Sequence, residues 1–191
     1  MDNANTTTLR KTAGYIGRMA LGGLMCLIVS LSVSAFIDHR LARFGTQLAC
    51  LILFTVMIYP AVQDEGSHDA NGINYAHETP KPLRGVLYGL WGCVPGWLVF
   101  LPLLAARLGV EAGFIREGIQ SIYRLLNPVF YGLNSTLLPH TLSLHELPWW
   151  VFAVLFLETL LPLVLCGFGY ALGLARVSMF ERMIYRRHAK A

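Results

Sequence analysis

A single acidic residue interrupts the most hydrophobic stretch of this sequence. Glu158 lies near the middle of the run Trp149 to Leu174, which is long enough to cross a bilayer. A carboxylate at mid-membrane is costly unless it faces the interior of a helix bundle, finds a partner or is protonated. We therefore expect one of two roles for Glu158. It either hydrogen-bonds to a neighbouring helix through Gln47, Ser30 or Ser32, or lies with Gln47 on an ion or proton path.

A second group of polar residues has the chemistry of a cation site. The segment 63–82 carries several carboxylates between two apolar runs. Within it, Asp69, Asn71 and Glu78 fall at the third, fifth and twelfth positions of an EF-hand loop, whose oxygen ligands suit calcium. Ser67 stands where such a loop begins with aspartate. We therefore predict no metal site but an acidic turn in solvent, in which these three residues are weak candidates for metal ligands.

The composition indicates that most of the chain lies in lipid. Of 191 residues, 55% are hydrophobic and 14% charged, which leaves too much apolar surface for one small water-soluble domain. The formal charge of +4 comes from Lys and Arg at the ends of apolar runs, a pattern that indicates topology and not nucleic-acid binding. All four cysteines lie inside apolar runs, so no disulfide framework or zinc cluster is expected. With no catalytic motif either, we expect neither an enzyme nor a cofactor.

Four long apolar runs predict an all-α membrane protein, a bundle of four transmembrane helices that forms one domain over residues 1–191. The expected spans cover about 19–37, 44–62, 85–106 and 149–174. The short link after the first span predicts a helical hairpin. Residues 63–82 are then an acidic loop on one side of the membrane, and residues 107–148 a long loop on the other.

Two further helices are predicted beside the bundle. Residues 114–126 place Ile119 and Ile122 on one face and charged residues on the other, which is typical of an amphipathic helix on a membrane surface. Near the C-terminus, Ser178 and Glu181 have the spacing of a capping box. A short interfacial helix with basic residues for anionic headgroups is expected to follow.

The distribution of Lys and Arg predicts the orientation. Most of them fall on one side of the four spans: Arg10, Lys11, Arg18, Lys81, Arg84, Arg176, Arg182, Arg186, Arg187 and Lys190. Because basic residues concentrate on the cytoplasmic side, both termini and the loop 63–82 should be cytoplasmic in a plasma membrane. The loop 107–148 should then be external. It holds Asn134 in a formal glycosylation sequon, which has meaning only in a eukaryotic secretory lumen.

Small residues recur at spacings that let helix backbones approach closely in lipid. They are Gly85, Gly89, Gly92, Gly96, Gly169 and Gly173. These glycines favour a non-enzymatic packing or accessory subunit that associates with copies of itself or with a larger membrane assembly. The alternative is a subunit of an oligomeric channel or transporter with Glu158 on the ion or proton path.

Several short motifs resemble those of uncharacterised small four-span membrane proteins of Gram-positive bacteria. They are Gly66-x-x-Asp69-x-Asn71, Leu83-Arg84-Gly85 before a span with Pro95, Tyr123-Arg-Leu-Leu-Asn127, Gly167-Phe-Gly-Tyr-Ala-Leu-Gly173 and Met183-Ile-Tyr185. The resemblance covers most of the chain and implies a bacterial plasma membrane without implying an activity. His68 stands where those proteins carry a basic residue, so no role for that position is implied.

Overall fold

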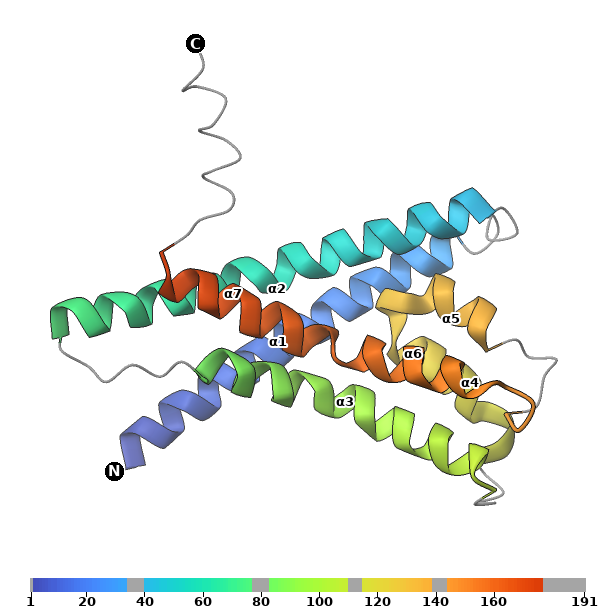
Figure 1. Cartoon of the computed structure of the whole chain (residues 1–191). Helices are drawn as coiled ribbons and strands as arrows, with labels where there is room; N and C mark the ends of the chain where they lie inside the picture. Colours follow the sequence, from blue (N-terminus) through green and yellow to red (C-terminus); the bar gives the residue numbers. More distant parts are fainter. Residues whose placement is uncertain (1, 34–39, 77–82, 110–114, 139–143, 177–191) are drawn as a thin grey trace, which may run out of the picture.

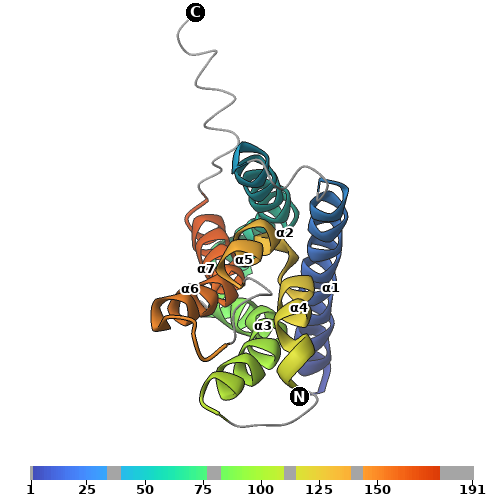
Figure 2. The same ribbon diagram turned by 90° about the vertical axis from the view of Figure 1, so that its right-hand side faces the viewer.

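The computed structural model describes residues 2–33, 40–76, 83–109, 115–138 and 144–176, and these ranges contain helices but no strand (Figure 1). The elements in chain order are α1 (Asp2–Ser32), α2 (Arg40–Ala76), α3 (Arg84–Arg107), α4 (Ile115–Leu126), the 3-10 turn η2 (Pro128–Phe130), α5 (Tyr131–Leu137), α6 (Trp149–Thr159) and α7 (Leu161–Leu174). The long helices run along a common direction, while α4, α5 and α6 gather at the end away from the N-terminus (Figures 1 and 2).

Four segments are long and apolar enough to cross a membrane, as the sequence predicts. They are Lys11–Ser32, Leu41–Ile73, Arg84–Arg107 and Trp149–Leu174. The all-α fold with four candidate spans is therefore confirmed. The predicted C-terminal interfacial helix falls within 177–191, outside the described residues.

The second span differs from its prediction because α2 has 37 residues and continues to Ala76. At about 1.5 Å per residue such a helix is about 55 Å long, well beyond the hydrocarbon core of a bilayer. The predicted acidic loop is therefore wrong for residues 63–76. The turn signal of the Asn-Gly pair at 71–72 is overridden because this part of α2 packs against α7 and the start of α3.

The fourth span is broken into two helices. α6 ends at Thr159 and α7 begins at Leu161, with Leu160 between them. Pro162 explains the break, because its ring nitrogen has no hydrogen to donate to the carbonyl oxygen of Glu158, four residues earlier. The break therefore lies next to the acidic residue of the span.

The predicted external loop 107–148 contains three helical elements, and part of it enters the bundle. The amphipathic helix is present as α4, but its Ile119 and Tyr123 are buried in a core shared with α3 and α6. The turn η2 contacts α1, where a Cβ on Gly23 would lie 3.5 Å from Pro128. The turn also contacts α2, so it packs against both helices of the α1–α2 hairpin.

Two hydrophobic cores hold the elements together. The first joins α3, α4 and α6 around Leu103, Tyr123 and Leu155. The second joins α1, α2, α3, η2 and α7, and includes Cys26 and Cys50 of the α1–α2 hairpin. Glu158, in the last turn of α6, lies between these two cores.

Candidate functional site

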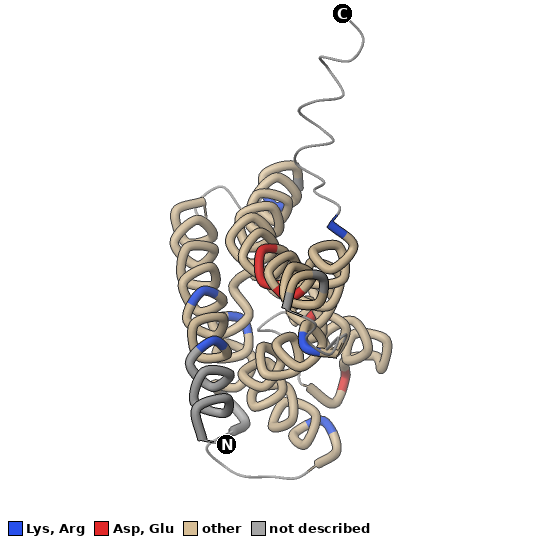
Figure 3. Tube along the Cα trace, turned by 90° about the vertical axis from the view of Figure 1, so that its left-hand side faces the viewer, with Lys and Arg blue, Asp and Glu red and all other residues tan. Residues whose placement is uncertain are grey.

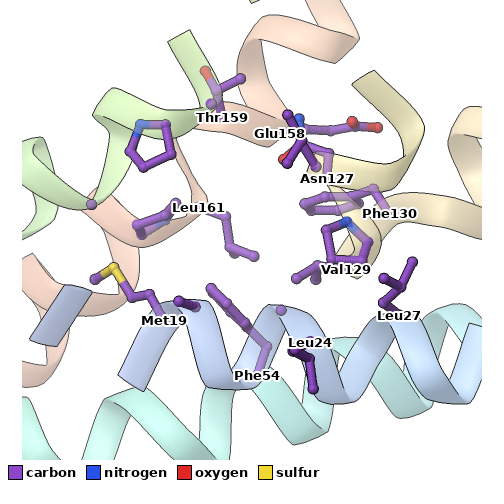
Figure 4. A pocket seen from close by; sticks show the side chains of 18 of the residues that line it. Met19, Leu24, Leu27, Phe54, Asn127, Val129, Phe130, Glu158, Thr159 and Leu161 are labelled. Atoms are coloured by element: carbon purple, nitrogen blue, oxygen red, sulfur yellow. The ribbon is translucent and has the colours of Figure 1, made fainter. Parts of the chain in front are cut away.

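A cavity of about 330 Å³ lies between α1, α3, the α4–η2 segment and the α6–α7 break (Figure 4). Its walls are mostly apolar, with Met19, Leu24 and Phe54 among them. Glu158 is the one charged residue that lines it within the described part of the chain. Figure 4 shows Glu158 beside Asn127 at one end of the cavity. Glu158 therefore borders an apolar chamber, while its two carboxylate oxygens are buried near Asn134 and Tyr123.

The Glu158 side chain is nearly inaccessible, with only 5% of the residue exposed. Neither carboxylate oxygen reaches a hydrogen-bond partner at normal geometry among the described residues. Burial without such bonds strongly disfavours an ionised carboxylate, which needs a proton or a cation to be stable there. A protonated structural carboxyl and a cation-binding carboxylate both meet this requirement.

Two polar side chains lie close enough to interact with Glu158. One is Asn134 of α5, which is fully buried and whose amide atoms also lack partners at normal geometry in the ranges that the structure covers. The other is Tyr123 of α4, whose hydroxyl donates to the carbonyl oxygen of Leu155 at 2.9 Å. Burial, and then the nearby Glu158, raises the pKa of Tyr123, so its hydroxyl remains a donor. Asn134 is too deeply buried to be a glycosylation acceptor.

Gln47 has contacts that differ from those expected for a path shared with Glu158. Its side-chain nitrogen donates to the carbonyl oxygen of Val129 at 2.8 Å, and its side-chain oxygen accepts from the Leu133 amide at 3.3 Å. Gln47 thus holds η2 and α5 against α2. This fixes the position of the cavity wall that η2 forms. Of the other predicted partners, Ser30 contacts Cys50 and Ser32 bonds to its own helix at Ile28.

A network of ion pairs and hydrogen bonds joins α1, α2, α3 and α7 at the opposite end, where Figure 3 shows acidic positions on α2 with basic positions on neighbouring helices. Arg84 donates to both carboxylate oxygens of Asp69 at 2.9 and 2.8 Å. Tyr170 of α7 donates to the same carboxylate at 2.6 Å. Lys11 of α1 pairs with Glu65 at 2.6 Å. The network therefore ties α1, α3 and α7 to the extended part of α2.

These contacts account for two of the three weak candidates for metal ligands. Asp69 is bound to Arg84, and Asn71 accepts from Arg176 at 2.7 Å. Both lie within α2, so the EF-hand arrangement is not formed. The described ranges contain no group of three or more His, Cys, Asp or Glu residues that could hold an ion. Glu78 lies outside the described residues.

The six predicted packing glycines lie at contacts between helices of this chain. Gly85, Gly89 and Gly96 of α3 face Tyr170, Leu163 and Thr159 of the broken span, and Gly92 faces Met19 and Pro162. Gly169 faces Tyr59, and Gly173 faces Gln63 and Gly66 of α2. Their close approaches are therefore used within the monomer.

Sequence reasoning identified Glu158 but missed its surroundings. Asn134 and Tyr123 are distant from it in sequence, and no spacing rule connects them. Pro162, four residues after Glu158, was the available signal for the helix break. Gly66, which approaches the backbone of Tyr170 and Gly173, was also missed as a packing residue.

Comparison with known proteins gave no match to a family model, to a curated protein or to a solved structure. The fold and the site define the class: an all-helical protein with four helices suited to a membrane.

Proposed function

We infer that this chain is a non-enzymatic membrane transport or binding protein, in which Glu158 takes up and releases a proton or a monovalent cation. The observation that carries this function is a carboxylate that is 5% exposed, without a hydrogen-bond partner at normal geometry among the described residues, at the break of a candidate spanning helix. Discontinuous spanning helices provide binding sites in many transporters, because unpaired backbone groups and buried charges meet there. The adjacent cavity gives a second ligand room to bind.

The test measures cation and proton flux in liposomes that contain the purified protein. The wild type should carry a flux that depends on a proton, sodium or potassium gradient, and Glu158→Gln should abolish it because an amide cannot ionise. Asp64→Asn is the matched control, since it also removes one negative charge but at an exposed position of α2. Equal flux in the wild type and Glu158→Gln would refute the function.

A second candidate is an accessory subunit of a membrane assembly, formed with copies of this chain or with a larger complex. It is favoured by a row of exposed apolar residues on α1. They are Leu21, Leu24, Met25, Ile28 and Leu31. The six glycines already contact other helices of this chain. In this candidate function, a partner would therefore contact the exposed row on α1. Disulfide crosslinking of Ile28→Cys in membranes tests this candidate, and a purely monomeric product would count against self-association.

We place the protein in a bacterial plasma membrane with both termini in the cytoplasm. The support is the excess of Lys and Arg at the end of the bundle that holds the network of Arg84 and Asp69. The end formed by α4, α5 and α6 is then external, and the site near Glu158 is reached from that side or from the lipid.

A further inference from the structure

The cavity beside α1 presents an almost entirely apolar surface (Figure 4). Among the described residues, polar side chains contribute to its wall at Asn127, Glu158 and Thr159 only. Both carboxylate oxygens of Glu158 are buried, and the hydroxyl of Thr159 donates to the carbonyl oxygen of Phe156 at 2.7 Å. Glu158 therefore presents no accessible charge to the cavity, and the Thr159 hydroxyl is already bonded. An occupant of this chamber meets hydrocarbon on nearly every side.

The size of the cavity exceeds that of an ordinary packing defect. Protein interiors contain few voids larger than a water molecule, and an apolar cavity of about 150 Å³ already stays dry and binds benzene. This cavity has a volume of about 330 Å³. Water finds few hydrogen bonds on such a surface, whereas a hydrocarbon supplies the dispersion contacts that the lining side chains lack. The chamber therefore favours an uncharged, apolar ligand.

The depth of the cavity determines which apolar molecule reaches it. Its lining includes Gly23, Gly96 and Leu161, each of which lies close to the midpoint of its candidate span. The hydrocarbon core of a bilayer is about 30 Å thick, so the headgroups lie about 15 Å away on either side. The molecules that surround the cavity at this depth are therefore the distal parts of lipid acyl chains.

The cavity also reaches the outer surface of the bundle. Leu24 of α1 and Leu126 of α4 both line it, and they are 54% and 63% exposed. Ala20 and Leu125, next to them in the lining, are exposed as well. Because these four residues are apolar and lie at the depth of the acyl chains, the opening that they border admits a flexible hydrocarbon chain from the side.

We propose that the cavity between α1, the α4–η2 segment and the α6–α7 break is a lipid site, which holds the distal part of one acyl chain of a membrane phospholipid. The chain enters between Leu24 and Leu126, while its headgroup stays at the membrane surface. Bound lipid then fills the space between α1 and the broken span and completes the packing of the bundle. The site is independent of the proposed function, because an acyl chain uses no ionised group.

The experiment uses photoreactive phosphatidylcholine in nanodiscs that contain the full chain. One probe carries a diazirine at the end of an acyl chain, and a second carries it next to the glycerol. After photolysis, mass spectrometry locates the labelled residues. Met19, Phe54 and Val129 line the cavity but are only 8%, 6% and 7% exposed, so a chain on the outer surface does not reach them. The chain-end probe should label these residues, and the glycerol-proximal probe should not.

Two variants of α1 form a matched pair. A Cβ on Gly23 would lie 3.5 Å from Pro128, so Gly23→Leu adds a side chain to the cavity wall without a backbone clash. It should reduce labelling of Val129 about tenfold relative to the exposed Ile28, which lies outside the lining. Gly17→Leu adds the same side chain to the same helix, at an exposed position outside the lining with nothing within 4 Å. This control should be labelled as the wild type is.

Four results would overturn the proposal. Label confined to exposed residues would mean that the chain does not enter the cavity, and equal labelling of Val129 by the two lipid probes would contradict the depth. Equal labelling of Val129 in the wild type and Gly23→Leu would place the chain elsewhere. A free alkyl diazirine of the same chain length is the third probe. If it labelled the cavity and the phospholipid did not, the ligand would be a free lipophile. Should Gly23→Leu not fold, the three probes on the wild type still decide.

Discussion

The carboxylate of Asp69 shows how one side chain can join three helices. It lies on α2 and accepts from Arg84 of α3 and from Tyr170 of α7. Its side chain is 12% exposed and that of Arg84 20%, so these bonds are only partly screened by water. From the sequence, Asp69 was expected in an acidic turn in solvent and was only a weak candidate for a metal ligand. In a helix, Glu65 and Asp69 instead share one face and meet basic residues.

Removing the Tyr170 hydroxyl tests this network. Tyr170→Phe should lower the free energy of unfolding by about 1 to 3 kcal/mol, because hydrogen bonds to charged groups lie in this range. Tyr75→Phe is the matched control, since Tyr75 is 79% exposed. Denaturant unfolding in detergent, followed by tryptophan fluorescence, measures both. If the two variants were equally stable, the bond to Asp69 would make no net contribution.

Substitution of Glu158, in contrast, should remove function without lowering stability. Its oxygens have no partner at normal geometry in the described part of the chain, so an apolar side chain removes a poorly compensated polar group. Glu158→Leu should therefore leave stability unchanged or raise it by about 1 kcal/mol, while cation-dependent stabilisation disappears. Thermal unfolding with and without added sodium measures both effects. A loss of several kcal/mol would instead assign Glu158 a structural role.

At the scale of the helices, the four apolar spans were predicted from the sequence. The extension of α2 beyond its span and the break within the fourth span were not. Hydropathy identifies residues that prefer lipid, so it could not predict that α2 continues to Ala76 as a polar helix packed on α7. The break after Thr159 was predictable from Pro162 in principle. The insertion of η2 against α1 was not, because it depends on tertiary contacts of Gln47.

Close approach between α2 and α7 depends on glycine. A Cβ at Gly173 would overlap the backbone of Gln63 and lie 2.9 Å from the Cα of Gly66. Gly173→Ala should therefore destabilise the protein by about 1 to 3 kcal/mol through overpacking, since backbone cannot move aside easily. Gly45→Ala in α2 meets nothing within 4 Å and should be neutral or stabilising by up to about 1 kcal/mol. Denaturant midpoints in detergent compare the two, and equal midpoints would contradict the packing.

For the candidate site, one residue was predictable and its environment was not. A carboxylate within an apolar run is visible in any sequence, which is why Glu158 could be identified. Its neighbours Tyr123 and Asn134 lie on α4 and α5, in a segment expected outside the bundle. Only the folded chain brings these three segments together around the carboxylate of Glu158.

The whole molecule has two ends of different construction. One end is tied by Lys11, Glu65, Asp69 and Arg84 into a network that links the long helices. The other end holds α4, α5 and α6 around an apolar core, with the cavity between the two (Figures 1 and 2).

Single introduced cysteines test the orientation of these ends. The four natural cysteines are free and buried, so a membrane-impermeant maleimide should leave the wild type unlabelled. Tyr75 and Leu108 are 79% and 64% exposed and lie at the ends of α2 and α3, at opposite ends of the bundle. In the proposed orientation, with the basic end in the cytoplasm, Leu108→Cys should be labelled in intact cells and Tyr75→Cys only after permeabilisation. Labelling of both in intact cells would exclude four spans with cytoplasmic termini.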